Sequence, residues 1–282
     1  MRILVAVDNS AESAVALRYA CHLLANSNSW METLYVKPDE ADITPENFYA
    51  PFVEKEDLVE WIESTAEEVE EQVLSSFDTC SAGKVACWRH VAAGDPADEI
   101  LKASDSRSYD MIVLGSQGRS ALRGFLLGAV HSKILHHSRK PVLIVRNFRP
   151  LQRVLVAYRG SRCDQGALKF LARLLAFKKP EITVLHVQET QRSESKEAAQ
   201  SCLLQGERTL REFDYAPVTR MVKGDFVDEI LKEVATERYD LVVLGAYGHN
   251  RPRYLKLITD EALNLVHLTN RPVLVYRDEA EP

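Results

Sequence analysis

Several features that mark particular classes of protein are missing from this sequence. No run of about 18 apolar residues is present, so a membrane-spanning helix is not predicted. Basic residues (35) are outnumbered by acidic residues (41), and the resulting net charge of -6 argues against a nucleic-acid binder. The chain meets an acid at Asp8, too early for a signal peptide. Its five cysteines form no C-x-x-C pair, which favours a reducing compartment, so we expect a cytoplasmic protein.

What the sequence does contain is a repeat of its own plan. Residues 109–118 (YDMIVLGSQG) return as residues 239–248 (YDLVVLGAYG). Further matching segments are residues 2–10 with 153–161 and residues 94–101 with 224–231. The offset falls from 151 (153 minus 2) to 130 (224 minus 94), so the second copy is shorter in its middle by 21 residues (151 minus 130). Two tandem domains are therefore predicted, at residues 1–148 and 151–282.

Within each half, short aliphatic runs alternate with amphipathic stretches. The runs of the first half are residues 3–7, 31–36, 85–91, 110–114 and 141–145. One intervening stripe has helical spacing and consists of Leu58, Ile62, Ala66, Val69 and Val73. Strands that alternate with helices predict an α/β fold, a doubly wound parallel sheet covered on both faces. We expect the halves to pair as an intramolecular pseudo-dimer through the apolar edge strands near residues 142–145 and 273–276.

The glycines and the first carboxylate predict a ligand site in the first half. In an open parallel sheet, ligands bind at the carboxyl ends of the strands, where the winding reverses. Asp8 ends the first strand and Gly115 the fourth, so Asp8 is expected to face the Gly115–Gly118 loop. A carboxylate there can accept hydrogen bonds from ribose hydroxyls or an adenine amine. A role for Asp8 as the N-cap of the following helix stays open beside the ligand role, although Asn9 or Ser10 could cap instead.

Other predicted site residues would bind the base and the phosphates. Gly128 follows Gly118 after nine intervening residues and opens a helix-like segment, whose first N–H groups suit phosphate oxygens. Val36 could form an apolar wall for a base, with Arg119 or Arg123 as counter-charge to the phosphates. The full predicted set is Ala6, Val7, Asp8, Val36, Gly115, Gln117, Gly118, Arg119, Gly128, Ala129 and Val130. No metal is predicted beyond magnesium carried by a nucleotide.

These residues give the chain a resemblance, over nearly all of its length, to the universal stress protein family in its tandem two-domain form. Nucleotide-binding members of the family show a first-strand Asp and the pattern G-x-x-G, nine residues, then G and Ser or Thr. Asp8, Gly115, Gly118 and Gly128 match that pattern. The resemblance implies two five-stranded sheets of order 3-2-1-4-5, of the adenine-nucleotide alpha hydrolase type. It also implies ATP or a related adenine nucleotide at the switch point and dimer-like packing through the fifth strands.

Both halves depart from the family pattern. In the first, Ala129 stands where a hydroxyl residue is expected, a loss on the order of 1.5–3 kcal/mol for a charged acceptor. Ser132 could compensate only if the helix began later. The missing contact to a phosphate therefore favours ADP or AMP as the ligand relative to ATP. In the second half, Arg159 replaces the first acid and Ile258 the third glycine, although Thr259 keeps a hydroxyl. The second half is predicted to be degenerate as an adenosine site.

Three functions stay open. The first is a cytoplasmic stress-response protein that binds ATP, ADP or AMP in its N-terminal domain as a sensor or regulator, with self-association into a homodimer or other homo-oligomer. The second is an interaction protein of the same fold that binds no nucleotide. The third is a slow ATPase, which is less favoured because no general base lies beside the glycines in the sequence. His131, His136 and His137 complete no metal cluster in the sequence. Cys163 is predicted to lie in the loop after the first strand of the second half, where its thiol could be exposed, and no base neighbours it in the sequence.

Overall fold

A computed structural model gives the structure of the 282-residue chain. It describes residues 1–8, 10–25, 27–39, 53–80, 86–106, 108–116, 128–189, 194–246 and 260–277, without the side chains of residues 70, 72–80, 86–87 and 260.

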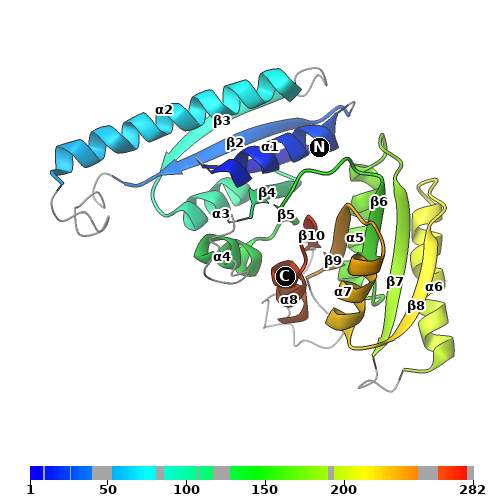
Figure 1. Ribbon diagram of the computed structural model, residues 1–282. Coiled ribbons are helices and arrows are strands. Elements are labelled where there is room, and N and C mark those ends of the chain that lie inside the picture. The colour runs from blue at the N-terminus through cyan, green and yellow to red at the C-terminus, as the bar shows by residue number, and fades with distance from the viewer. Residues whose placement is uncertain are drawn as a thin grey trace.

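Strands and helices alternate along both halves, as the sequence predicts (Figure 1). The first half consists of β1 (Arg2–Val7), α1 (Ala11–Leu24), β2 (Trp30–Lys37), α2 (Lys55–Cys80), β3 (Ala86–Ala93), α3 (Pro96–Ser106), β4 (Met111–Gly115), α4 (Ala129–His137) and β5 (Val142–Val145). The second consists of β6 (Arg153–Ala157), α5 (Arg162–Leu174), β7 (Glu181–Glu189), α6 (Lys196–Arg211), β8 (Val218–Gly224), α7 (Phe226–Thr236), β9 (Leu241–Gly245), α8 (Asp260–Leu268) and β10 (Val273–Tyr276).

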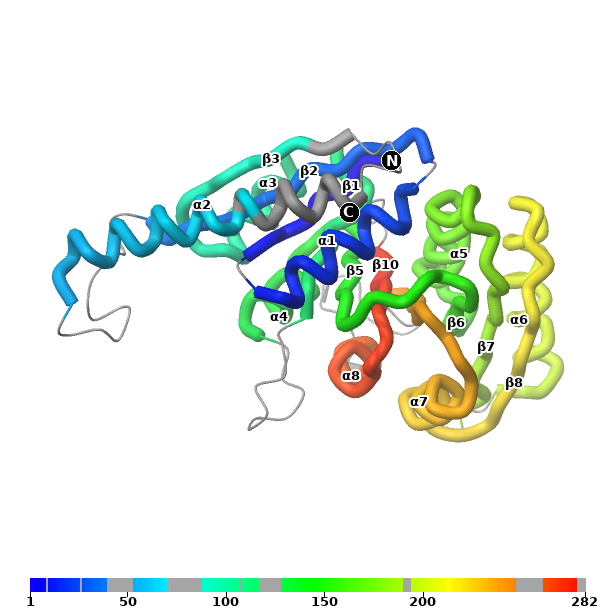
Figure 2. The backbone as a smooth tube through the Cα atoms, turned by 45° about the horizontal axis from the view of Figure 1, so that its top comes forward, coloured from blue at the N-terminus to red at the C-terminus, as the bar shows by residue number. Residues whose placement is uncertain are grey.

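The strands form one sheet of ten, in the order β3-β2-β1-β4-β5-β10-β9-β6-β7-β8. Figure 2 shows β5 of the first half beside β10 of the second. Each half is parallel and has the order 3-2-1-4-5, which confirms the predicted fold class. The two predicted sheets are joined into one because β5 and β10 pair antiparallel, with Leu143 opposite Leu274. This pairing covers both apolar edges and confirms that the halves pack through their fifth strands.

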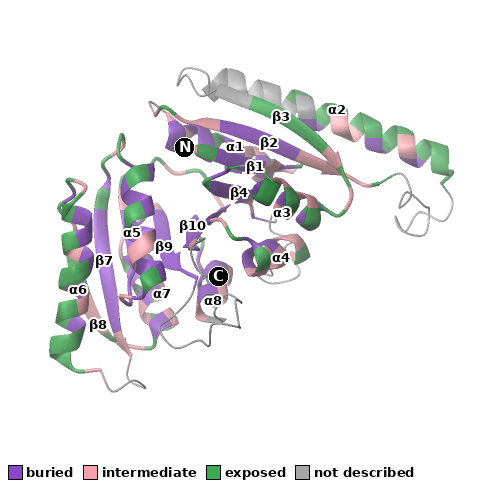
Figure 3. Cartoon of the chain, turned by 180° about the vertical axis from the view of Figure 1, so that it is seen from behind, coloured by how far each residue is buried: buried purple, intermediate pink, exposed green. Residues whose placement is uncertain are grey.

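Helices cover both faces of the sheet, and the central strands between them are largely buried (Figure 3). The buried side chains form two cores. On one face, α1, α2, α5 and α6 pack against strand residues such as Val5 and Val156; on the other, α3, α4, α7 and α8 pack against residues such as Leu4 and Leu155. The predicted stripe of α2 is buried at Leu58, Ile62 and Val69. None of the described helices is both long enough and apolar enough to cross a membrane.

Two arginines tie the last helix of each half to the other half. Arg277, after β10, is buried and donates to the backbone oxygens of Leu135, His136 and Ser138 at the end of α4. Arg146, after β5, donates to the backbone oxygen of Val266 on α8. The last carbonyls of a helix have no partner within the helix and favour a cation. Each half therefore caps a helix of its neighbour.

The segment between β5 and β6, where the domain boundary is predicted, is packed against the first half. The Phe148 ring lies 6.3 Å from Tyr19 and 5.5 Å from His22, both on α1. The N–H of Leu151 donates to His22 Nε2 over 3.2 Å. The two halves are therefore joined through this segment as well as through the sheet; the bounds 1–148 and 151–282 stay a prediction.

Candidate functional site at the carboxyl ends of the first-half strands

Asp8 lies at the carboxyl end of β1, between the ends of β2 and β4. The pairing of Ala6 with Leu114, continued by two residues, places Asp8 beside Ser116, just past Gly115. Asp8 is exposed, and its Oδ1 accepts hydrogen bonds from the backbone N–H and the hydroxyl of Ser10. The N-cap of α1 is Ser10, whose Oγ accepts from the Ser13 N–H over 3.1 Å. Ser10, and not Asp8, is therefore the N-cap of α1. The Asp8 carboxylate lies at the edge where ligands of such sheets bind.

Gly115 is required by packing. A Cβ atom at this position would lie 2.6 Å from the carbonyl oxygen of Glu12 and 2.9 Å from the backbone nitrogen of Ser13, in the first turn of α1. Gly245 in the second half meets α5 in the same way, with a Cβ 2.5 Å from Asp164 Oδ1. The glycine at the end of this strand thus lets a helix approach the sheet, a reason that sequence reasoning did not supply. Gln117, Gly118 and Arg119 of the predicted set, and Arg123, lie outside the described residues.

Gly128 is the N-cap of α4, as its position in the sequence predicts. Its backbone is extended (φ -61°, ψ 160°), and no side chain caps the helix there. The first turn contains no acid; Ala129 is exposed and Val130 is partly buried against the core. Ser132 lies within the helix, where its N–H donates to the Gly128 oxygen over 3.1 Å, so it cannot stand in for the missing hydroxyl. The N–H groups of the first turn remain as donors to an anion.

His131 was not among the predicted binding residues, yet it joins two parts of the predicted site. Its Nε2 donates to the backbone oxygen of Gly115, which links α4 to the end of β4. Burial lowers the pKa of His131, the Gly115 carbonyl and Asp8 oppose that shift, and Arg146 adds to it. The sequence signal was its place as the third residue after Gly128. Among the described residues no three His, Cys, Asp or Glu side chains gather as a metal site requires.

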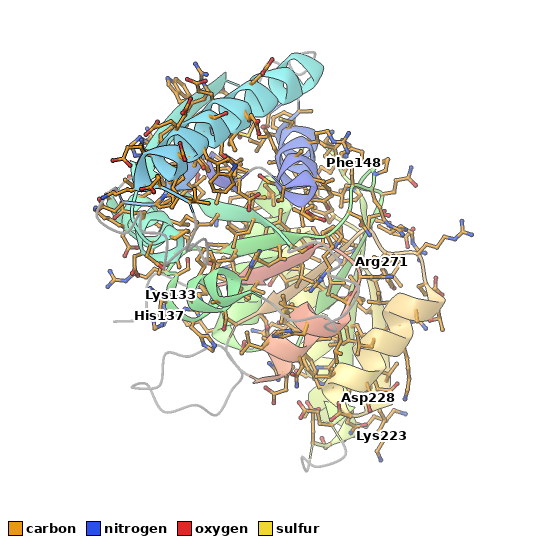
Figure 4. The ribbon with its side chains drawn as sticks, turned by 60° about the vertical axis from the view of Figure 1, so that its left-hand side comes forward. Lys133, His137, Phe148, Lys223, Asp228 and Arg271 are labelled. Carbon is orange, nitrogen blue, oxygen red and sulfur yellow. The ribbon has the colours of Figure 1, made fainter. Side chains whose placement is uncertain are left out.

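Lys133 fixes α4 from another side. Its Nζ lies 2.7 Å from Asp98 and 3.2 Å from Asp95, both at the beginning of α3. In Figure 4, Lys133 lies on α4 near His137. Asp95 also accepts from the Asp98 N–H over 3.0 Å and so caps α3, which begins at Pro96. The position of α4 is therefore set by α3, by β4 through His131 and by the second half through Arg277.

The remaining predicted residues lie along β1 and β2. Ala6 and Val36 are partly buried and pack with the core on the α3–α4 side, the same core that Val130 contacts. Val7 is buried on the opposite side, so it takes part in packing and not in the exposed edge. Tyr35, next to Val36, was not predicted: burial raises its pKa, and Asp8 raises it further. The structure thus brings Ala6, Asp8 and Val36 to one edge with Gly115 and the beginning of α4, while their role in binding stays a prediction.

In the second half, the same edge is occupied by the chain's own side chains. Arg159, which replaces Asp8, is buried, and its guanidinium lies 4.1 Å from the centre of the Phe226 ring. Beside it, burial raises the pKa of Asp164, which Arg159 opposes. His186, which replaces Tyr35, is also buried, and its ring contacts Glu194 at 2.9 Å. Ile258 and Thr259 lie outside the described residues.

The prediction of an exposed Cys163 is wrong. Cys163 is the second residue of α5 and is buried, with its Sγ 3.1 Å from the backbone oxygen of Tyr276. The reason is a capping box in which Ser161 and Asp164 start α5 earlier than expected.

Comparisons with known proteins agree with this architecture. The universal stress protein YxiE of Bacillus subtilis is 33% identical over 146 residues, which cover 51% of this chain and 98% of that protein. A universal stress protein of Synechocystis, Slr1230, is 30% identical over 174 residues, 60% of this chain and 58% of that protein. The crystal structure of a universal stress protein from Archaeoglobus fulgidus shares the fold over 98% of both chains, with a TM-score of 0.74 and 21% identity.

The sequence pattern of the family as a whole matches twice. The model of the universal stress protein family covers residues 1–146 and again residues 150–277. These two segments correspond to the two halves of the ten-stranded sheet. The chain therefore belongs to the universal stress protein family, in a form with two tandem domains.

Proposed function

We propose that the first half binds an adenine nucleotide (ATP, ADP or AMP) at the carboxyl ends of β1, β2 and β4, and that the protein acts as a sensor or regulator in a stress response. The proposal includes the predicted cytoplasmic location. Homo-oligomerisation also stays a prediction.

The observation that carries the proposal is the exposed Asp8 carboxylate beside the uncapped beginning of α4. Asp8 follows β1 beside Ser116, one residue past Gly115, and His131 connects Gly115 to the first turn of α4. An acceptor for hydroxyl or amine groups and the N–H groups of the first turn of α4, which Gly128 does not cap with a side chain, therefore lie at one edge of the sheet. A nucleotide needs both, because its sugar and base offer donors while its phosphates are anions.

Each residue has a distinct role in the proposed complex. Asp8 accepts from a ribose hydroxyl or the adenine amine, and Val36 and Val130 offer apolar surface to the base. The phosphate seat, which consists of the N–H groups of Gly128, Ala129 and Val130, binds phosphate oxygens. Gln117, Gly118 and Arg119 are proposed to complete it. Magnesium, where required, enters with the nucleotide.

The Ala129 position favours ligands with fewer phosphates. A serine or threonine there would add one hydrogen bond to a charged acceptor, so its absence costs on the order of 1.5–3 kcal/mol. The lost bond weakens the seat without removing its backbone donors. We therefore propose that ADP or AMP competes well with ATP.

Calorimetry on nucleotide-free protein tests the proposal. We expect ATP, ADP and AMP to bind, and Asp8→Ala to weaken binding by roughly 10- to 100-fold, since a hydrogen bond to a charged group contributes about 1.5–3 kcal/mol. Asp110→Ala is the matched control, because Asp110 is an exposed carboxylate that accepts from the Arg2 N–H at the opposite end of β1. It should leave binding unchanged.

Two results would favour the other functions. Folded, nucleotide-free protein that binds none of the three nucleotides would indicate an interaction protein of the same fold. Phosphate release from ATP that exceeds background and is lost in Asp8→Ala would indicate a slow ATPase.

A further inference from the structure

The beginning of α4 carries an imidazole where other polar groups are missing. Ala129 offers no hydroxyl, Ser132 is one turn too far along, and no acid stands in the first turn. His131 is the third residue of the helix. Because helical side chains lean toward the N-terminus of their helix, the His131 ring lies beside the first turn. Its hydrogen bond to the Gly115 oxygen confirms this direction, since Gly115 ends the neighbouring strand.

That contact fixes which nitrogen carries the proton in the neutral ring. A carbonyl oxygen can only accept, so Nε2 must be protonated in order to donate to Gly115. In the neutral tautomer Nδ1 is then an unprotonated acceptor. A second proton would go onto Nδ1 and would convert the ring into an imidazolium without breaking the bond to Gly115.

The charged groups around His131 come from several elements. Asp8 at the end of β1 favours the imidazolium, whereas Arg146 after β5 opposes it. On α4 itself, Lys133 is paired with Asp95 and Asp98 of α3. His136 and His137 stand at the far end of the helix, where Arg277 donates to the His136 oxygen. Arg119 and Arg123 lie outside the described residues.

We propose that His131 belongs to the anion site and couples nucleotide binding to proton uptake: its ring joins the end of β4 to the phosphate seat and, once protonated on Nδ1, brings to the seat the positive charge that binds phosphate. This inference rests on the proposed function. It adds His131 to that site. It also predicts that pH regulates the site, since a fall in pH would increase the affinity for nucleotide.

The direction follows from linkage. In the free protein, burial keeps the pKa of His131 below its ordinary value, so the ring is neutral near pH 7. A phosphate close to the ring favours the imidazolium and raises its pKa. Binding therefore takes up a proton between the two pKa values, and affinity rises as the pH falls through that range.

The test compares the intact protein with His131→Gln. Glutamine retains an amide donor for the Gly115 oxygen but does not titrate. Calorimetry with AMP, in buffers of different ionisation enthalpy, measures the protons taken up per nucleotide bound. His137→Gln is the matched control, because His137 is an exposed histidine at the other end of the same helix. The phosphate of AMP also titrates, with a second pKa of about 6, but it does so equally in all three proteins. The difference in proton uptake between the intact protein and His131→Gln therefore excludes it.

We expect the intact protein and His137→Gln to take up more protons than His131→Gln, by as much as about one proton per nucleotide. The ratio of intact to His131→Gln affinity should grow as the pH falls, by up to about tenfold per pH unit. In the intact protein, NMR titration should show that AMP raises the pKa of the His131 ring, a measurement that does not depend on how a variant folds.

The two hypotheses fail in different ways. AMP binding with the same proton uptake in all three proteins, or an unchanged His131 pKa in the complex, would overturn the inference and leave nucleotide binding intact. If the folded intact protein binds no nucleotide at any pH, the proposed function fails and the inference fails with it.

Discussion

At the end of its first strand, one half of the chain carries an exposed Asp8 and the other a buried Arg159. The neighbouring differences point the same way. Pro96, at the first turn of α3, is replaced by Phe226, on whose ring Arg159 stacks. Tyr35 is replaced by His186, which contacts Glu194. At this edge the second half has thus placed buried side chains of its own, whereas the corresponding Asp8 of the first half is exposed.

The helices that face these edges differ as well. The first turn of α4 begins with Ala129 and Val130 and has no acid, whereas the first turn of α8 contains Glu261. An acid in the first turn stabilises a helix by interacting with its dipole. The same acid repels a phosphate, so α8 is poorly suited to bind one. The comparison teaches that a repeated fold can keep its packing glycines while only one copy keeps the acid and the acid-free helix beginning that the proposed nucleotide would contact.

The largest effect on stability is expected at the packing glycines that both halves share, Gly115 and Gly245. Gly115→Ala and Gly245→Ala should each lower the free energy of unfolding by about 3 kcal/mol, because the new methyl group would meet the first turn of α1 or α5. Urea unfolding measures both. Gly128→Ala is the control, since Gly128 has a φ of -61° that alanine adopts, and should cost less than about 1 kcal/mol. Unchanged stability in Gly115→Ala would show that packing is not why this glycine is repeated.

The next effect concerns the reciprocal arginine caps. Arg277→Met removes three hydrogen bonds to the end of α4, and we expect a loss of about 2 kcal/mol in unfolding free energy. Arg146→Met removes the bond to Val266 on α8 and should cost about 1 kcal/mol. Urea unfolding, together with amide exchange in α4 and α8, measures which variant loses more stability. A greater loss in Arg146→Met would contradict the view that Arg277, with three hydrogen bonds, makes the stronger of the two caps.

The sequence predicted the features that depend on neighbouring residues better than the contacts between residues far apart in the chain. The strands and their order followed from local aliphatic runs, from the repeat and from the family resemblance. The contacts that distinguish the halves are not local: Arg159 stacks on Phe226, and Gly115 meets the backbone of Glu12. No pattern in a single sequence pairs such positions. The start of α5 was a missed local signal, because Ser161 and Asp164 form a legible capping box.

The same argument applies to the candidate site. Asp8, Gly115 and Gly128 were placed at one edge because parallel strands end together. In the sequence, His131 was considered only for a metal cluster, which it does not complete. Its partner is a backbone oxygen, which the sequence does not mark. A contact with a backbone atom is visible only once the chain is folded.

A smaller effect, on nucleotide affinity, is expected at the beginning of α4. Ala129→Ser supplies the hydroxyl that the family pattern has at this position, and we expect tighter nucleotide binding by about tenfold, or roughly 1.5 kcal/mol. Ser132→Ala is the matched control: Ser132 lies within the helix, so removing its hydroxyl should not change the affinity. Calorimetry with ADP measures both variants. Equal affinities in Ala129→Ser and the intact protein would indicate that the phosphates do not reach the beginning of α4.

The smallest effect concerns the joint between the halves. His22 on α1 accepts the N–H of Leu151, which requires an unprotonated Nε2, and burial and then Lys178 lower its pKa. The unfolded chain therefore takes up a proton that the folded chain resists. The stability that His22 provides is complete above the ordinary histidine pKa of about 6.5 and is lost as the pH falls through and below it.

We expect the contribution of His22 to stay below about 1 kcal/mol, because its ring is partly exposed and screened by solvent. His22→Gln keeps an acceptor for Leu151 but cannot titrate, so its stability should match the intact protein near pH 7 and fall less toward pH 5. Urea unfolding across this range measures the difference, with His137→Gln as the control. His131 also has a lowered pKa, so part of the slope should persist in His22→Gln. An identical slope in His22→Gln and the intact protein would mean that the joint does not sense pH through this ring.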